Sequence, residues 1–313
     1  MSAAPRRIGA LDVTIAGLGC NNFGRRIDEA RTREVVDAAL DAGVGVFDTA
    51  DLYGDGASEQ LLGKALGARR DDVVVVTKFG MRRPPDGMTG GDPSWVARAC
   101  DGSLRRLGTD RIDVYLLHTP DEATPVGDTL EAMGGLVDEG KVREIGCSNF
   151  SPAQLDEAAA AASERSLRPF VVVQNEYSLL HREPEAGVLE ACDRLGMSLM
   201  PYYPLASGLL SGKYRRGEPA PAGRLGGGDG RVAENVVDAA GLDASERLTA
   251  YAESKGHTLL ELSLSWLASR SQVATAIAGA TSAEQVRANA AATRAWTLTG
   301  EDQAEIDGIV GPD

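Results

Sequence analysis

The chain alternates between short apolar runs and longer segments with apolar residues at helical spacing. The apolar runs read VGVFD, DVVVVTK, IDVYLLH, VREIGCSN, FVVVQN, SLMPYY and ATAIAG. They are continuously apolar, which is typical of strands that are covered on both faces. The pattern therefore predicts a parallel sheet in which strands and helices alternate.

Six helices are predicted between these strands. They span residues 32–41, 58–66, 93–107, 126–139, 152–162 and 185–195. Three of them carry N-capping signals, with Ser58 in the sequence SEQ, Asp92 before Pro93, and Ser151 before Pro152.

The spacing of the strands predicts a closed barrel. Successive strand ends, from Asp48 through Lys78, His118, Ser148 and Gln174 to Tyr202, lie 26 to 40 residues apart. One more strand near residues 15–18 and another near 274–277 bring the total to eight. Eight such units form a (β/α)8 or TIM barrel. We expect one domain over residues 1–313, with a hairpin at residues 6–15 at the barrel bottom and long loops at the C-terminal face.

Composition narrows the possible partners. The 313 residues are 43% hydrophobic and 25% charged, as in ordinary globular proteins, and the formal net charge is -14. That charge argues against nucleic acid as the main partner. The chain has neither the apolar stretch of a signal peptide nor the roughly 20 apolar residues of a membrane span. We expect a cytoplasmic protein, and no pattern indicates its oligomeric state.

The cysteines predict neither disulfides nor a metal site. Cys20, Cys100, Cys147 and Cys192 are widely separated, with no CxxC pair and no histidine cluster nearby. Four buried thiols and no bound metal are expected.

Polar residues stand where the predicted strands end. Each has an ordinary explanation when taken alone, such as a turn residue or a hydrogen-bonded structural histidine. In a TIM barrel, however, these strand ends face one mouth where catalytic groups collect. The set therefore predicts an active site, and it consists of Asp48, Lys78, His118, Ser148 with Asn149, Gln174 with Asn175, and Tyr202.

The residue types favour proton transfer to a carbonyl oxygen. Tyr53 follows the strand that ends at Asp48. A phenol with a pKa near 10 is a poor acid unless a cation favours its ionised form, and Lys78 can be that cation, with Asp48 as counter-charge. His118 can hydrogen-bond the oxygen beside the phenol. Since GxSxG, HExxH and GK[ST] motifs are absent, the electrons for a carbonyl reduction must come from a cofactor.

Several stretches in this order resemble the aldo-keto reductase family over nearly the whole chain. They are FDTADLYGDGASEQLLGKAL, VVVTKFG, LRRLGTDRIDVYLLHTPD, GCSNF, VVVQNEYS, PYYPLASGLLSGKY and GATSAEQVRANAAA. The resemblance implies a catalytic tetrad of Asp48, Tyr53, Lys78 and His118. Tyr53 would be the general acid, Lys78 would lower its pKa, Asp48 would hold Lys78, and His118 would position the carbonyl.

The resemblance also implies an NADPH site that does not use a Rossmann fold. The closest stretch to GxGxxG is GLGCNN at residues 17–22, which lacks the third glycine. Ser148, Asn149 and Gln174 would hold the nicotinamide carboxamide, and Tyr202 would stack on the ring. The remaining implied contacts are Leu205, Ser207, Gly208, Leu209 and Lys213 for the pyrophosphate, and Gly279, Gln285 and Asn289 for the adenosine.

Three positions depart from the family pattern. Gly279 stands where some members carry a lysine, Gln285 where they carry an arginine for the 2'-phosphate, and Tyr203 where a small hydroxyl residue is common. NADPH is the expected cofactor, and NADH remains open. The missing charge could come from Lys213, Arg216, Arg224 or Arg287.

The leading hypothesis is NADPH-dependent reduction of an aldehyde or ketone. One alternative is a cofactor-binding regulatory subunit, like the potassium-channel β subunits of this family, and another makes Lys78 a Schiff-base lysine. Substrate specificity is expected in residues 23–28, 81–92 and 211–230, with Phe23 in the pocket. The stretch 211–229 is either a lid or a solvated loop.

Overall fold

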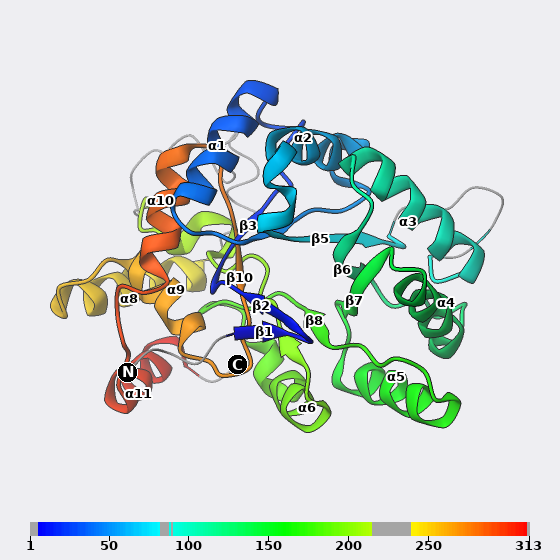
Figure 1. Cartoon of the computed structure of the whole chain (residues 1–313). Coiled ribbons are helices and arrows are strands. Elements are labelled where there is room, and N and C mark those ends of the chain that lie inside the picture. The colour runs from blue at the N-terminus through cyan, green and yellow to red at the C-terminus, as the bar shows by residue number, and fades with distance from the viewer. Residues whose placement is uncertain (1–5, 82–87, 89, 215–238, 312–313) are drawn as a thin grey trace.

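A closed barrel of parallel strands forms the centre of the protein. The computed structural model describes residues 6–81, 88, 90–214 and 239–311. Its eight-stranded sheet has the order β10-β3-β4-β5-β6-β7-β8-β9 (Figure 1). The strands are β3 (Ala16–Gly19), β4 (Val46–Asp48), β5 (Val74–Phe79), β6 (Ile112–Leu117), β7 (Val142–Ser148), β8 (Val172–Gln174), β9 (Ser198–Leu199) and β10 (Ala276–Gly279).

The two edges of this sheet meet through backbone hydrogen bonds. The amide of Ala274 donates to the carbonyl of Leu199, and the amide of Ile277 donates to the carbonyl of Pro201, each at 2.9 Å. These bonds join the segment around β9 to that around β10 and leave the barrel without an open edge. The prediction of a (β/α)8 barrel is confirmed.

The N-terminal hairpin covers the bottom of the barrel, as predicted. Strands β1 (Arg6–Ile8) and β2 (Leu11–Val13) pair antiparallel. Ile8 and Leu11 are buried against the barrel interior, where they share a cluster with Val46 at the start of β4. The Ser198 hydroxyl donates to the carbonyl of Arg7 at 2.7 Å. Since β9 begins at Ser198, the hairpin sits at the N-terminal ends of the strands.

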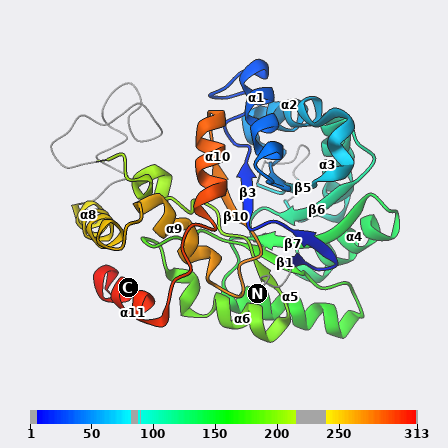
Figure 2. The ribbon, with the colours of Figure 1, turned by 60° about the vertical axis from the view of Figure 1, so that its left-hand side comes forward.

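Helices surround the barrel (Figures 1 and 2). All six predicted helices are present, within a few residues at their ends, and the described part of the chain contains four further helices towards the C-terminus. α8 packs against α9 and α11 at the side of the ring. The helices are α1 (Glu29–Asp41), α2 (Ala57–Leu66), α3 (Pro93–Leu107), α4 (Val126–Asp138), α5 (Pro152–Arg165), α6 (Val188–Leu195), α8 (Ala239–Ser254), α9 (Leu259–Ala268), α10 (Ala283–Ala292) and α11 (Gly300–Val310).

Two of the three predicted helix caps are confirmed, and one is wrong. The Asp92 side chain accepts from the amide of Ser94, and Ser151 forms a capping box with Gln154. Ser58, however, lies inside α2, which begins after Gly56. Its hydroxyl is buried and donates to the carbonyl of Cys20 at 2.8 Å, so it joins α2 to the end of β3.

Three further observations concern the cysteines, membrane-spanning helices and the predicted lid. All four cysteines are free and buried, as predicted. Within the described residues, no helix combines the length and the apolar character that a membrane crossing requires. The predicted lid at 211–229 lies outside the described residues beyond Tyr214.

Candidate active site

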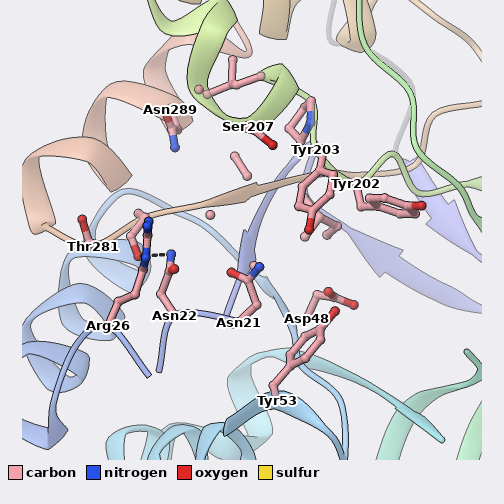
Figure 3. A pocket seen from close by; sticks show the side chains of 18 of the residues that line it. Asn21, Asn22, Arg26, Asp48, Tyr53, Tyr202, Tyr203, Ser207, Thr281 and Asn289 are labelled. Carbon is pink, nitrogen blue, oxygen red and sulfur yellow. Dashed lines mark hydrogen bonds between the residues drawn. The ribbon is translucent and has the colours of Figure 1, made fainter. Parts of the chain in front are cut away.

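A cavity of about 940 Å³ opens at the C-terminal ends of the strands. Its wall contains the last residue of β3, β4, β7, β8 and β10, and the residue that follows β6 (Figure 3). Because parallel strands point the same way, these side chains converge on one mouth. The six residues are Gly19, Asp48, Ser148, Gln174, Gly279 and His118.

Lys78 forms a buried network beneath this cavity. Its Nζ lies 2.7 Å from Oδ1 and 2.8 Å from Oδ2 of Asp48, and it also donates to the carbonyl of Thr49 at 2.8 Å. The same Nζ is 3.4 Å from the Tyr53 hydroxyl. Lys78 is fully buried and Asp48 is 3% exposed, so the two charges interact in a medium of low polarity. Three of the predicted residues are thus in direct contact.

A turn in the left-handed conformation presents Tyr53. The short helix η1 (Tyr53–Gly56) has positive φ at three successive residues, Gly54 (57°), Asp55 (57°) and Gly56 (89°). Two glycines adopt this conformation without a steric penalty, whereas Asp55 is a strained exception. The Thr49 and Ser58 hydroxyls bond each other at 2.8 Å across the base of the turn. The sequence YGDG therefore fixes where the phenol lies.

The ionisation of Tyr53 differs from the sequence-based expectation. Burial raises its pKa above the ordinary 10, the positive charge of Lys78 opposes this, and the charge of Asp48 adds to it. Lys78 thus acts in the predicted direction, but the net pKa shift of Tyr53 is upward. For Lys78, burial lowers the pKa, and the contacts with Asp48 and Tyr53 outweigh it, so the net shift is upward. The pair is a neutral phenol and a charged ammonium at neutral pH.

His118 faces Tyr53 as a neutral ring. Their ring centroids are 6.0 Å apart, with planes at 81°. Burial, and after it the charge of Lys78, lowers the pKa of His118 to about 3. Its Nδ1 is buried and has no hydrogen-bond partner among the described residues. A neutral imidazole can hydrogen-bond an uncharged oxygen without bringing in a second positive charge.

Side-chain amides and hydroxyls lie next to His118 and Asp48. Asn149 Nδ2 donates to the carbonyl of His118 at 2.9 Å, and Asn149 Oδ1 accepts from the Tyr202 hydroxyl at 2.7 Å. The Ser148 hydroxyl donates to the carbonyl of Gln174 at 2.7 Å. Gln174 Nε2 donates to Asp48 Oδ1 at 2.9 Å, which leaves its Oε1 as an acceptor. These groups have the donor and acceptor character that a bound carboxamide requires.

Most of the predicted site residues line the cavity. Tyr53, Asn149, Tyr202, Leu205, Ser207, Gly208, Lys213, Gln285 and Asn289 do so in addition to the strand-end residues. Lys78 does not, because it is fully buried below the wall, in contact with Asp48 and Tyr53.

One expectation for the cavity wall is wrong, and the predicted contact of Leu209 with the pyrophosphate stays a prediction. Leu209 is 4% exposed and does not line the cavity with the neighbouring Gly208. Phe23 was expected in the pocket and is instead fully buried in the hydrophobic core, where it anchors the loop that follows β3.

Sequence reasoning missed a group of polar residues at the cavity wall. Asn21 and Asn22 were considered only as part of the stretch GLGCNN and were given no role in the cavity. Arg25 and Arg26 were placed in a substrate loop without a role in cofactor binding. They line the cavity together with Asp55, Met81, Tyr203 and Thr281. The signal for Arg26 was the pair of adjacent arginines in a loop at the barrel mouth of an acidic chain.

The cavity fits a nicotinamide dinucleotide. Amide groups lie beside Asp48 and His118 at one end, and the cations Arg26 and Lys213 are also part of the wall. A dinucleotide carries a carboxamide at one end and phosphates along its length, which match these two kinds of group. The described residues include no cluster of His, Cys, Asp or Glu that could hold a metal ion.

Comparison with known proteins identifies the family. The sequence pattern of the Aldo/keto reductase family matches residues 16–310. The chain is 36% identical over 303 residues to a probable voltage-gated potassium channel subunit beta from Oryza sativa subsp. japonica, covering 92% of this chain and 90% of that one. It is 31% identical over 298 residues to L-glyceraldehyde 3-phosphate reductase from Escherichia coli O157:H7, covering 92% and 86% of the two chains.

Comparison with solved structures agrees with this family. The structure of a glycerol dehydrogenase from Gluconobacter oxydans superposes with a TM-score of 0.83 at 26% identity, covering 99% of this chain and 96% of the other. The chain belongs to the aldo/keto reductase family. It is an oxidoreductase of that class.

Proposed function

We propose that this protein reduces an aldehyde or a ketone to an alcohol with NADPH and that Tyr53 is the general acid. The observation that carries the proposal is the contact of one buried ammonium, Lys78 Nζ, with both the Asp48 carboxylate and the Tyr53 phenol. An ion pair with a purely structural role would not require a phenol next to the ammonium. Proton donation at the cavity wall does require an acidic group there, and Tyr53 provides it.

The site residues have complementary roles in the proposed reaction. A bound reduced nicotinamide supplies the hydride that the carbonyl carbon receives. The Tyr53 hydroxyl donates its proton to the carbonyl oxygen, so that hydride and proton together give the alcohol. Lys78 stabilises the phenolate that Tyr53 becomes, and Asp48 keeps Lys78 charged and in place. Neutral His118 hydrogen-bonds the carbonyl oxygen and holds it beside the phenol.

The amide cluster supports a role in cofactor binding. In the proposed site, Ser148, Asn149 and Gln174 hold the carboxamide, and Tyr202 stacks on the nicotinamide ring. Gln174 belongs to both parts of the site because it also bonds Asp48. This contact would fix the position of the hydride relative to the proton donor.

The experiment that tests this function measures binding and turnover separately. NADPH binding is followed by nucleotide fluorescence, with NADH in parallel. Turnover is followed by oxidation of NADPH with a panel of carbonyl compounds. Glyceraldehyde and dihydroxyacetone belong in that panel because relatives are named for three-carbon substrates. The Tyr53→Phe variant should bind NADPH like the wild type and lose turnover, and unchanged turnover would exclude Tyr53 as the acid.

A second candidate function is that of a cofactor-binding regulatory subunit. It is supported by the 36% identity to a probable potassium channel subunit beta. NADPH binding without oxidation by any compound of the panel, in the wild type as well as in Tyr53→Phe, would favour this candidate.

A further inference from the structure

Positive charge gathers at the cavity of an otherwise acidic protein. The formal net charge of the chain is -14, yet Arg25, Arg26 and Lys213 all line the cavity. The arginines lie in the loop between β3 and α1, and Lys213 follows the short helix η5 (Ala206–Ser211). Burial and the charge of Arg26 both lower the pKa of Lys213. Arg26 and Lys213 therefore repel each other, and an anion bound between them would reduce this repulsion.

The backbone holds Arg26 at a defined place. The carbonyl of Asn22 accepts from the amides of Arg25, Arg26 and Ile27 at 3.2, 2.8 and 3.1 Å. Phe23 anchors the same turn in the core. Asn22 Nδ2 donates to the carbonyl of Ala280 at 3.3 Å, which joins the loop to the end of β10. Arg26 thus lies beside Asn22, on the side of the cavity that carries Thr281 (Figure 3).

The part of the wall next to Arg26, around the start of α10, provides no charge of its own. Its cavity residues Thr281, Gln285, Ala288 and Asn289 are neutral. Gln285 Oε1 accepts from the amide and the hydroxyl of Thr281, at 2.8 and 3.1 Å, so only its amide hydrogens remain for a ligand. Gly279 has no side chain, and a Cβ at that position would lie 3.6 Å from both Asn21 Oδ1 and Asn22 Nδ2. Position 279 therefore faces the loop that carries Arg26.

We propose that Arg26 selects NADPH over NADH by binding the 2'-phosphate of the adenosine half. This inference rests on the proposed function, because it assumes that the cavity holds a nicotinamide dinucleotide. A guanidinium can bind two phosphate oxygens at once, which suits a terminal phosphate that carries close to two negative charges. Lys213 would take the pyrophosphate, which both cofactors share. The charge for cofactor selection thus comes from the β3–α1 loop and not from α10.

The test compares dissociation constants for NADPH and NADH, measured by fluorescence without any carbonyl compound. The variants are Arg26→Gln, which removes the charge, Arg26→Lys, which retains it, and Arg287→Gln. Arg287 is exposed on α10 and is absent from the cavity wall, so it is a matched control. Arg26→Gln should weaken NADPH binding by about tenfold or more and leave NADH binding within about threefold. Arg26→Lys should recover part of the preference, and Arg287→Gln should retain all of it.

Each result decides the question. A loss confined to NADPH supports the inference, and 2'-AMP should then compete with NADPH more strongly for the wild type than for Arg26→Gln. An equal loss for both cofactors would assign Arg26 to the pyrophosphate and overturn the inference, as would unchanged NADPH binding. A wild type that binds both cofactors equally overturns it and leaves the reductase proposal intact. A wild type that binds neither cofactor contradicts the proposed function itself.

Discussion

The side-chain amide of Gln174 donates a 2.9 Å hydrogen bond to Oδ1 of Asp48, the same carboxylate that Lys78 contacts. The two residues are 126 positions apart and end different strands, β8 and β4. The oxygens of Asp48 therefore accept hydrogen bonds from side chains of two other strands, β5 and β8. One buried carboxylate thus connects the proposed proton donor to the proposed carboxamide site.

Removing the charge of Asp48 should destabilise the protein strongly. Asp48→Asn leaves Lys78 fully buried without its counter-ion, at a cost of about 3–5 kcal/mol in the free energy of unfolding. Adding Lys78→Met removes the unpaired charge, so the double variant should lose less than the sum of the two single losses. Urea unfolding of the four proteins measures this coupling.

The control for this cycle is an exposed ion pair. Lys64 Nζ and Glu29 Oε2 are 2.8 Å apart, with side chains 60% and 61% exposed. Glu29→Gln should change the free energy of unfolding by less than about 1 kcal/mol. Strictly additive losses for Asp48→Asn and Lys78→Met would show that the buried pair is not coupled.

His118 should make stability depend on pH below neutrality. Its pKa is about 3 in the folded protein because the ring is buried, whereas an unfolded histidine has a pKa of about 6.5. Between these values the unfolded chain binds a proton that the folded chain does not, so stability falls as the pH falls through this window. Between about pH 6.5 and 5 the loss should reach about 2 kcal/mol.

A His118→Gln variant isolates this effect. The other two histidines, His181 and His257, remain in both proteins, so the difference in slope belongs to His118. Urea unfolding at several pH values should give a flatter profile for the variant above about pH 5, where few carboxyl groups titrate. Equal slopes for the two proteins would mean that the folded ring takes up protons near its ordinary pKa.

The barrel and most of the site could be predicted from the sequence because both depend on short-range patterns. Continuous apolar runs identify strands that are covered on both faces, and the residue that follows each run must face the barrel mouth. Asp48, His118 and Gln174 follow this rule. The rule fails for Asn175, which turns away and donates to the carbonyl of Phe150 at 2.9 Å.

The remaining site residues depend on backbone geometry that residue types do not specify. Ala206, Ser207 and Gly208 all have positive φ, at 44°, 58° and 106°. Leu209, which follows this unusual sequence of left-handed residues, is 4% exposed and is absent from the cavity wall. The direction of the pKa shift of Tyr53 could not be predicted from the sequence either, because it depends on how far burial outweighs the charge of Lys78.

Contact between α2 and α3 should be sensitive to a single methyl group. A Cβ added at Gly63 would lie 2.0 Å from the carbonyl oxygen of Leu107, so the two helices would have to separate. Gly63→Ala should cost about 1–3 kcal/mol in thermal or urea unfolding. Because α2 continues from the turn that presents Tyr53, turnover should fall as well.

Gly135→Ala in α4 is the matched control for Gly63→Ala. No heavy atom lies within 4 Å of a Cβ added there. Alanine is the better helix former, so this change should leave stability unchanged or raise it by up to about 1 kcal/mol. A stable Gly63→Ala protein with full turnover would show that the two helices separate without cost.

The pH dependence of turnover should identify Tyr53 as the acid. The pKa of Tyr53 lies above its ordinary 10, and that of His118 is lowered to about 3, so neither group changes its charge near neutrality. For carbonyl reduction, kcat/KM at saturating NADPH should be constant from about pH 5 to about pH 9. If protonated His118 were the acid, the rate would instead fall about tenfold for each pH unit above the pKa of its ring.

Alcohol oxidation needs the Tyr53 phenolate as base, so its rate should rise with pH over the same range. In Tyr53→Phe, kcat for reduction should fall by about 10²- to 10⁴-fold. A reduction rate that declines steadily from pH 6 upward would contradict the assignment of Tyr53 as the acid, even if Tyr53→Phe has a lower kcat.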